Sequence, residues 1–473
     1  MVRILRNLRL YLRKQGLRLK NQGQSECSRS RRGWIHMDER RRVLDYLWKK
    51  GIVATPDEVD EIMRNGGINF LIEGMNRREE VKRFEIIKSR EYFEGTTGKS
   101  ESFRRLFQDR FVKIKKILQS RVSVSSPVDI EFAKMHEGET TVVAMVRDVR
   151  TSRYGYVLEL EDLTGSVIAY ADQAIGETLL PDDIIGVRGN FKNGKLYVKE
   201  VTYPGVDNAQ KKEKIIESES AIAFISDTHV GSRMFLQEHF MRFLEWLKNS
   251  ESGRKVRYII INGDLVDGIG IYPGQEKDLE MDDIYEQYSK LADLLNLLNN
   301  EINIFLIPGN HDLVRIAEPQ PVLPREIRSM FNDNVRFLSN PSYISIEGMK
   351  ILLYHGMSLN DLMDLIRGMK YDNVLKMMEE LLKRRHLAPF YGRNVPIAPT
   401  PEDFMVIEEV PDIFVTGHIH VHRTGIYHGV LLLNASTWQK QTDYQRMHNF
   451  VPDPCKVTIK FLNKPGFSVL DFK

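Results

Sequence analysis

Short apolar runs alternate with helical segments in the second half of the chain. The predicted strands are Ala221–Ser226, Tyr258–Asn262, Ile302–Ile307, Ile351–Tyr354 and Ile413–Thr416. Apolar residues recur with helical spacing at 236–247, 279–298 and 372–385, between several of these strands. Alternation of this kind is typical of a layered α/β domain. We therefore expect an α/β domain over residues 219–473.

Residues 140–203 have a different pattern, with shorter alternating strands. The predicted strands are residues 141–146, 156–160, 167–170, 184–189 and 196–198. Asn193-Gly194 separates the last two and predicts a two-residue hairpin. Five or so short strands suit a small barrel of the OB type, which we expect over residues 130–208. Such barrels bind single strands or serve as docking modules. Because no aromatic series stands out in the sequence, we favour docking.

Helical signals dominate residues 37–118. Thr55-Pro56-Asp57-Glu58 combines a capping box with proline at the first helical position. Another helix is expected at residues 107–118, after a polar linker near 95–105. The chain is therefore predicted to be a multidomain α+β protein with a small N-terminal helical domain, an OB-like barrel and a layered α/β domain.

Length and composition exclude several classes of protein. The chain has 473 residues, of which 42% are hydrophobic and 28% charged, and this describes a globular protein with more than one domain. Since no apolar run approaches the roughly 18 residues of a membrane span, we expect no membrane partner. Cys27 and Cys455 are too few for a disulfide framework, so we expect a cytoplasmic location.

Positive charge is concentrated at the N-terminus. Residues 1–36 contain ten Lys or Arg and one acid, whereas the whole chain carries a net charge of +3. This tail is interpreted either as a cationic arm for nucleic acid or as residues upstream of the true start at Met37.

Each predicted strand of the α/β domain is followed by a polar cluster. The clusters are Asp227-Thr228-His229, Gly263-Asp264, Gly309-Asn310-His311-Asp312, His355-Gly356 and Gly417-His418-Ile419-His420. Side chains at the carboxyl ends of neighbouring strands converge on one crevice in open α/β sheets. We therefore expect these clusters to form a single site.

The residue types suit two divalent ions. Two cations close together need a shared carboxylate, and Asp264 is the natural bridge. The remaining ligands divide into Asp227, His229 and His420 for one ion and Asn310, His355 and His418 for the other. Nitrogen and oxygen ligands without a thiolate favour Mn²⁺, Fe²⁺ or Zn²⁺ over Mg²⁺, and we expect Mn²⁺. Two such ions hydrolyse phosphoesters. Asp267 and Asp312 are either orienting residues or turn formers.

The order D-x-H, G-D, G-N-H, H, G-H-x-H resembles the calcineurin-like metallophosphoesterase superfamily over about residues 221–440. The resemblance implies that His311 contacts the scissile phosphate and protonates the leaving oxygen. It also implies that Asp312 orients His311.

Other segments narrow the resemblance. Residues 263–275 lack the arginine that protein Ser/Thr phosphatases carry after the second aspartate. Together with residues 317–321, 398–403 and 434–438, they look like the small-subunit family of archaeal DNA polymerase D. This resemblance implies a 3′→5′ proofreading exonuclease that acts on single-stranded or mismatched 3′ ends of DNA. It also implies a separate large polymerase subunit as partner, with a sliding clamp reached through the complex.

Two other functions remain open. One is a non-catalytic assembly subunit, and the other is a phosphoesterase acting on a different phosphodiester. Arg315, Arg393 and Lys440 are candidates for guiding DNA, solely because they are near the motifs.

Overall fold

The computed structural model describes residues 40–47, 55–64, 67–68, 84–93, 98–206, 212–447 and 449–473. The chain divides into two compact units, Met1–Glu85 with Ile346–Gly348 and Ile86–Ser345 with Met349–Lys473. No helix in the described ranges combines the length and apolar character needed to cross a bilayer.

The first unit contains a short helical core. Residues 40–47 are helical, and α3 spans Pro56–Arg64. Val43 and Leu47 pack against Val59 and Ile62, and α3 begins at Pro56, as the Thr55-Pro56 signal predicted. The expected basic tail, residues 1–36, lies outside the described residues.

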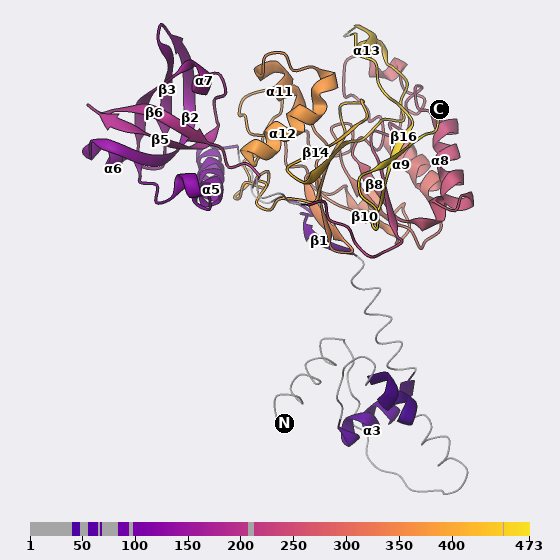
Figure 1. The fold of residues 1–473 in the computed structure, drawn as a ribbon. Helices are drawn as coiled ribbons and strands as arrows, with labels where there is room; N and C mark the ends of the chain where they lie inside the picture. Colours follow the sequence, from indigo (N-terminus) through magenta and orange to yellow (C-terminus); the bar gives the residue numbers. More distant parts are fainter. Residues whose placement is uncertain are drawn as a thin grey trace, which may run out of the picture. The chain divides into compact units, whose positions relative to one another are not determined.

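A closed five-stranded barrel begins the second unit (Figure 1). Its strands are β2 (Gly138–Ser152), β3 (Gly155–Glu161), β4 (Ser166–Ala171), β5 (Ile184–Lys192) and β6 (Lys195–Thr202), joined in the order β2-β3-β4-β6-β5. The short elements around it are η1 (Val122–Val124), α6 (Ile130–Met135) and α7 (Gln173–Gly176). Positive φ angles at Asn193 (51°) and Gly194 (70°) confirm the hairpin predicted from that dipeptide.

The helix α5 (Ser100–Gln119) is longer than predicted. The linker expected near residues 95–105 is wrong from Ser100 onward, because those polar residues form the first turns of α5. Glu101 forms ion pairs with Arg104 and Arg105, three and four residues along the chain, and this spacing stabilises a helix.

Two six-stranded sheets build the rest of the second unit. The first has the order β10-β9-β8-β7-β16-β17. Its strands are β7 (Ala221–Ile225), β8 (Val256–Asn262), β9 (Asn303–Ile307), β10 (Val335–Phe337), β16 (Lys456–Phe461) and β17 (Ser468–Asp471). Strands β7 to β10 are parallel, so their carboxyl ends meet at one edge.

The second sheet has the order β1-β11-β12-β13-β15-β14. Its strands are β1 (Phe84–Lys88), β11 (Ser342–Ile346), β12 (Met349–Leu353), β13 (Ile413–Thr416), β14 (Arg423–Tyr427) and β15 (Val430–Asn434). Strands β12, β13 and β15 are parallel. All five strands predicted for the α/β domain are therefore present, within a few residues of their expected bounds.

Amphipathic helices complete the two cores. α8 (Gln237–Asn249) and α9 (Ile284–Asn296) share a core with the first sheet, and α12 (Val374–Arg384) shares one with the second. The remaining short helices are η2 (Gly253–Lys255), η3 (Gln275–Lys277), α10 (Arg325–Arg328), α11 (Leu359–Leu365), η4 (Tyr371–Asn373) and α13 (Asp443–Met447). The two sheets are linked at the carboxyl ends of β8 and β12, where the Asn262 side-chain amide donates to the Tyr354 carbonyl at 2.8 Å.

Candidate metal centre

The loops after β7, β8, β9, β12 and β13 bring the predicted ligands together. Three overlapping groups place their ligand atoms within 4.8 Å of one another, namely Asp227–His229–His420, His229–Asp264–His311 and Asp264–His355–His418. Convergence of the polar clusters at strand ends is thus observed, as expected for this topology.

Asp264 lies between the two halves of the cluster. Its Oδ2 is 3.8 Å from Nε2 of His229 and 3.4 Å from Nε2 of His355. The Asn310 Oδ1 is 3.2 Å from the same His355 nitrogen, while Asp227 Oδ1 is 3.3 Å from His420 Nε2. One carboxylate therefore touches both groups of predicted ligands.

Several ligands have an unusual backbone conformation. The φ angles are positive at Asp227 (50°), His229 (46°), Asp264 (46°) and His418 (63°). Non-glycine residues rarely adopt this region, and such strain clusters at functional sites. All four residues lie in the loops that directly follow β7, β8 and β13.

Glycines beside the ligands are required by space. A Cβ on Gly309 would lie 2.2 Å from Asp264 Oδ1, and a Cβ on Gly417 would lie 2.6 Å from Asp227 Oδ2. Either side chain would displace a carboxylate of the cluster. The glycines in the G-N-H and G-H-x-H motifs therefore permit the backbone to approach the ligands closely.

Hydrogen bonds orient two of the histidines. His229 Nδ1 donates to Asp267 Oδ1 at 3.1 Å, and His355 Nδ1 donates to the Asn262 carbonyl at 3.0 Å. Both acceptors require a proton on Nδ1, so in the neutral ring Nε2 carries the lone pair that can bind a metal. Between the two interpretations of Asp267, the structure shows an orienting residue.

Two partners of the histidines were not found from the sequence. The Asn360 amide lies 2.9 Å from Nε2 of His418, and the Gln445 amide lies 2.9 Å from Nδ1 of His420. Asn360 is in α11 and Gln445 is in α13, outside every polar cluster that follows a predicted strand. No spacing signal connects them to the motifs.

The electrostatics of the cluster are dominated by its carboxylates. Burial opposes ionisation of Asp264, but His355 and His311 outweigh it and hold the pKa of Asp264 well below its usual range. Burial lowers the pKa of His355, yet the Asp264 carboxylate prevails and raises it to about 10. The pKa of His418 falls to about 3 through burial and the charge of His355. The site therefore favours positive charge beside its aspartates.

His311 belongs to one of the three groups, and its ring is held by a backbone carbonyl. Nδ1 donates to the Asp267 carbonyl at 2.7 Å, and the backbone N–H donates to Asp264 Oδ1 at 2.9 Å. Asp312 is expected to orient the His311 ring, but within the described residues no hydrogen bond joins the two side chains. Asp312 instead accepts hydrogen bonds from the backbone N–H groups of Leu265 and Gly309 and from the Tyr288 hydroxyl. Its carboxylate therefore joins the loop after β8 to the loop after β9, because buried backbone N–H groups need a hydrogen-bond acceptor.

The three candidate DNA-guiding residues differ in their surroundings. Arg315 donates to the Pro319 carbonyl at 2.6 Å and stacks over Phe93, so its guanidinium is already engaged. Arg393 and Lys440 are exposed.

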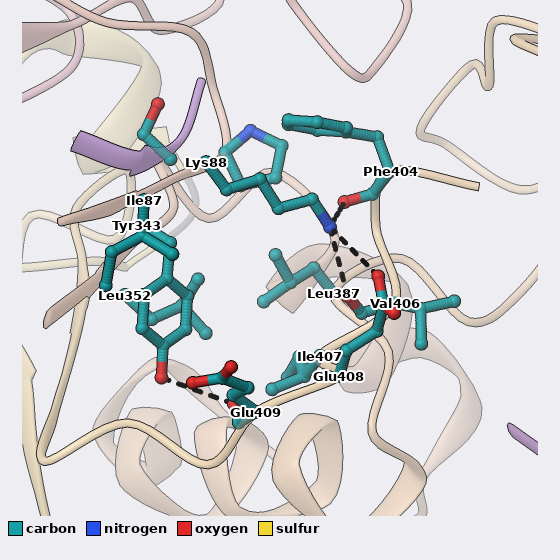
Figure 2. Close-up of a pocket in the computed structure, with 12 residues that line it drawn as sticks. Ile87, Lys88, Tyr343, Leu352, Leu387, Phe404, Val406, Ile407, Glu408 and Glu409 are labelled. Atoms are coloured by element: carbon teal, nitrogen blue, oxygen red, sulfur yellow. Dashed lines mark hydrogen bonds and ion pairs between the residues drawn. The ribbon is translucent and has the colours of Figure 1, made fainter. Parts of the chain in front are cut away.

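A separate pocket contains none of the predicted ligands (Figure 2). It has a volume of about 230 Å³, and its walls include Leu352, Leu387 and Phe404. Lys88 donates to the Phe404 carbonyl at 3.0 Å and lies over that residue's ring. The lining also includes Glu408 and Glu409, and Lys88 Nζ lies 3.8 Å from Glu408 Oε1.

Comparison with known proteins identifies the family. Residues 222–423 match the family of the B subunits of DNA polymerase alpha/epsilon. The DNA polymerase II small subunit of Thermoplasma acidophilum is 38% identical, covering 92% of this chain and 93% of its own length. The DNA polymerase II small subunit of Archaeoglobus fulgidus is 41% identical, covering 89% of this chain and 88% of its own length. A solved archaeal phosphodiesterase aligns at 13% identity, over 53% of this chain and 98% of its own, with a TM-score of only 0.27. The chain belongs to the DNA polymerase II small-subunit family, as its resemblance to the polymerase D small subunit predicted.

Proposed function

We propose that this chain is a metal-dependent 3′→5′ exonuclease that proofreads for a separate large polymerase subunit. The observation that carries the proposal is the position of Asp264 between two groups of buried ligands. Membership in a polymerase small-subunit family supplies the substrate, the 3′ end of single-stranded or mismatched DNA.

The residues present fit two divalent ions. In the described chain, every ion-pair partner of Asp227 and Asp264 is a histidine. Two buried carboxylates without lysine or arginine need cations or protons to remain buried. The oriented Nε2 atoms of His229 and His355 then supply the nitrogen ligands. This donor set suits Mn²⁺, with Fe²⁺, Zn²⁺ or Mg²⁺ as alternatives.

Each residue then has a distinct role. Asp264 would bridge the ions, which when bound polarise the phosphate and make water a better nucleophile. His311 would act as the general acid for the leaving 3′-oxygen. Burial lowers its pKa, but Asp264 and Asp267 outweigh this and raise it above the ordinary value, which favours the protonated form that a general acid needs. Asp312 would position the loops on which these residues lie.

We also propose the domain arrangement in full. Residues 37–118 would form a helical domain, 130–208 an OB domain and 219–473 the phosphoesterase domain. The barrel order β2-β3-β4-β6-β5 supports the OB assignment, since OB barrels are five-stranded Greek-key barrels. The partners would be the large subunit and DNA, with Arg393 and Lys440 as DNA contacts.

The test is digestion of a 3′-labelled single strand with Mn²⁺, by the chain alone and with the large subunit. We expect shortening from the 3′ end that EDTA stops and that Asp264→Asn abolishes. His136→Ala is the matched control, because His136 is exposed on the barrel and touches no ligand. If neither the chain nor the two-subunit complex shortens the strand, the assembly-subunit interpretation replaces the nuclease.

A further inference from the structure

We propose that the outer face of β4 and β6 is a binding surface for single-stranded nucleic acid, whose bases stack on Tyr170 and Tyr197. This surface lies on the barrel, and it is separate from the predicted metal ligands. The proposal does not depend on nuclease activity.

The fold brings the two tyrosines together. β4 and β6 are parallel neighbours in which Tyr170 and Tyr197 occupy the same register position. Their ring centroids are 5.5 Å apart with an interplanar angle of 21°, which is a stacked pair. Because 26 positions separate them in the sequence, neither run of residues shows an aromatic series by itself.

Both rings lie on the outside of the barrel. Ala169 and Leu196, their neighbours along the strands, are fully buried in the barrel interior. Side chains alternate between the two faces of a strand, so the tyrosines face outward. Tyr197 is 46% exposed, and Ile168, on the same face of β4, is 41% exposed. An open aromatic and apolar surface of this kind lets a planar group stack on it.

Positive charge adjoins the stacked pair. Lys195 Nζ lies 5.5 Å from the centre of the Tyr170 ring, and Lys192 is opposite Lys195 in the hairpin. Both lysines are exposed, and within the described residues neither forms an ion pair. Glu137, which precedes β2, accepts a hydrogen bond from the Asn193 backbone in the hairpin turn.

The remaining charges on these strands are largely neutralised. Arg188 forms ion pairs with Glu139 and Glu200, and Lys199 also pairs with Glu139. The cations left beside the tyrosines are therefore Lys192 and Lys195. Two stacked rings next to two uncommitted lysines match a strand of bases linked by phosphates.

A purely structural role predicts a different outcome. Cross-strand tyrosine pairs stabilise a sheet, so on that account their removal lowers the melting temperature without affecting a ligand. If the face binds nucleic acid, removing the tyrosines instead lowers the affinity for the oligonucleotide with little change in the melting temperature. Any base offers a π-face, so we expect weak sequence preference and strong salt dependence.

The experiment measures fluorescence anisotropy of a labelled oligothymidylate with the full chain in EDTA, which removes divalent ions from the metal centre. We expect Tyr197→Ala to weaken binding about five- to hundredfold. Tyr197→Phe retains the stacking ring and should bind as wild type. Tyr285→Ala is the matched control, since Tyr285 is 48% exposed in α9.

A charge variant tests the same surface independently. Lys192→Glu with Lys195→Glu should reduce affinity and lower the slope of log affinity against log salt by about 0.7 for each lost phosphate contact. Lys248→Glu, at an exposed position in α8, is its control. Unchanged binding in both Tyr197→Ala and the double lysine variant would overturn the proposal. So would normal oligonucleotide binding combined with lost assembly with the large subunit, because the face would then be a protein interface.

Discussion

Two buried clusters in the second unit both contain aspartate and histidine, but they balance the aspartate charge in different ways. In the candidate metal centre, Asp264 and Asp227 have histidines as their ion-pair partners. In the other cluster, which we call the arginine lock, Asp403 accepts from Arg110 Nε at 2.6 Å and from His386 Nε2 at 3.0 Å. All three residues of the lock are buried.

The difference between the clusters is where the positive charge comes from. Arg110 is permanently charged, so the lock is balanced by the chain itself. Burial raises the pKa of Asp403, but Arg110 and His386 outweigh it and hold the pKa well below its usual value. Among the described residues the metal centre has no such arginine, so its positive charge comes from protonated histidines or from bound cations. A buried aspartate next to histidines therefore indicates a metal only where no arginine is present.

The largest expected effect separates catalysis from metal binding within the centre. We predict that His311→Ala lowers nuclease turnover about 10²–10⁴-fold, the usual contribution of a positioned general acid. Metal content should be unchanged, because in this proposal His311 acts on the substrate and is not one of the metal ligands. The measurements are single-turnover digestion of a mismatched 3′ end and metal analysis. Loss of the metals would make His311 a ligand instead.

Breaking the lock should affect folding and leave metal binding unchanged. Arg110→Ala leaves Asp403 buried without its cation, so we predict that unfolding becomes easier by about 3–5 kcal/mol. The matched control is Arg105→Ala, because its exposed pair with Glu101 is screened by solvent and contributes little to stability. Urea denaturation measures both variants. Equal stability of the two variants would show that the lock contributes nothing.

The lock should also make stability depend on pH. Burial, followed by the charge of Arg110, lowers the pKa of His386 to about 4 from an ordinary 6.5. The folded state therefore binds fewer protons than the unfolded state, and this contribution is complete above pH 6.5 and is lost as the pH falls toward 4. We expect His386→Gln to remove about 3 kcal/mol of that pH dependence. His136→Gln, at an exposed position, is the control, and an identical pH slope in all three proteins would refute the assignment.

The smallest effect concerns orientation within the metal centre. Asp267 fixes the His229 ring without being among the predicted ligands. We predict that Asp267→Asn weakens Mn²⁺ binding about 10–100-fold, as is usual for such partners. Calorimetric titration measures the affinity. An affinity loss as large as that of a ligand variant would indicate that Asp267 binds metal directly.

The sequence predicted that the candidate ligands would lie close together because their positions follow from topology. Strands that are parallel and adjacent must end at one edge, so polar residues after β7, β8 and β9 converge whatever the loops do. The barrel hairpin at Asn193-Gly194 was predictable for a local reason, since that dipeptide favours positive φ angles.

What the sequence did not reveal depends on contacts between distant segments. Asn360 reaches His418 from a helix 58 positions away, and Tyr170 meets Tyr197 only because β4 and β6 pair. Asp312 follows His311 directly in sequence, yet its carboxylate turns toward backbone donors of two loops. The position of Asp312 next to His311 in the sequence therefore did not indicate its hydrogen-bond partners.

The central claim is that the centre binds two divalent ions that share Asp264. Its most direct test is the number of Mn²⁺ ions bound per chain in the wild type, Asp264→Asn and Asp403→Asn, measured by metal analysis after dialysis. We predict about two ions in the wild type, a loss at both sites in Asp264→Asn and two ions in folded Asp403→Asn. Two ions retained by Asp264→Asn, or none bound by the wild type, would contradict the claim.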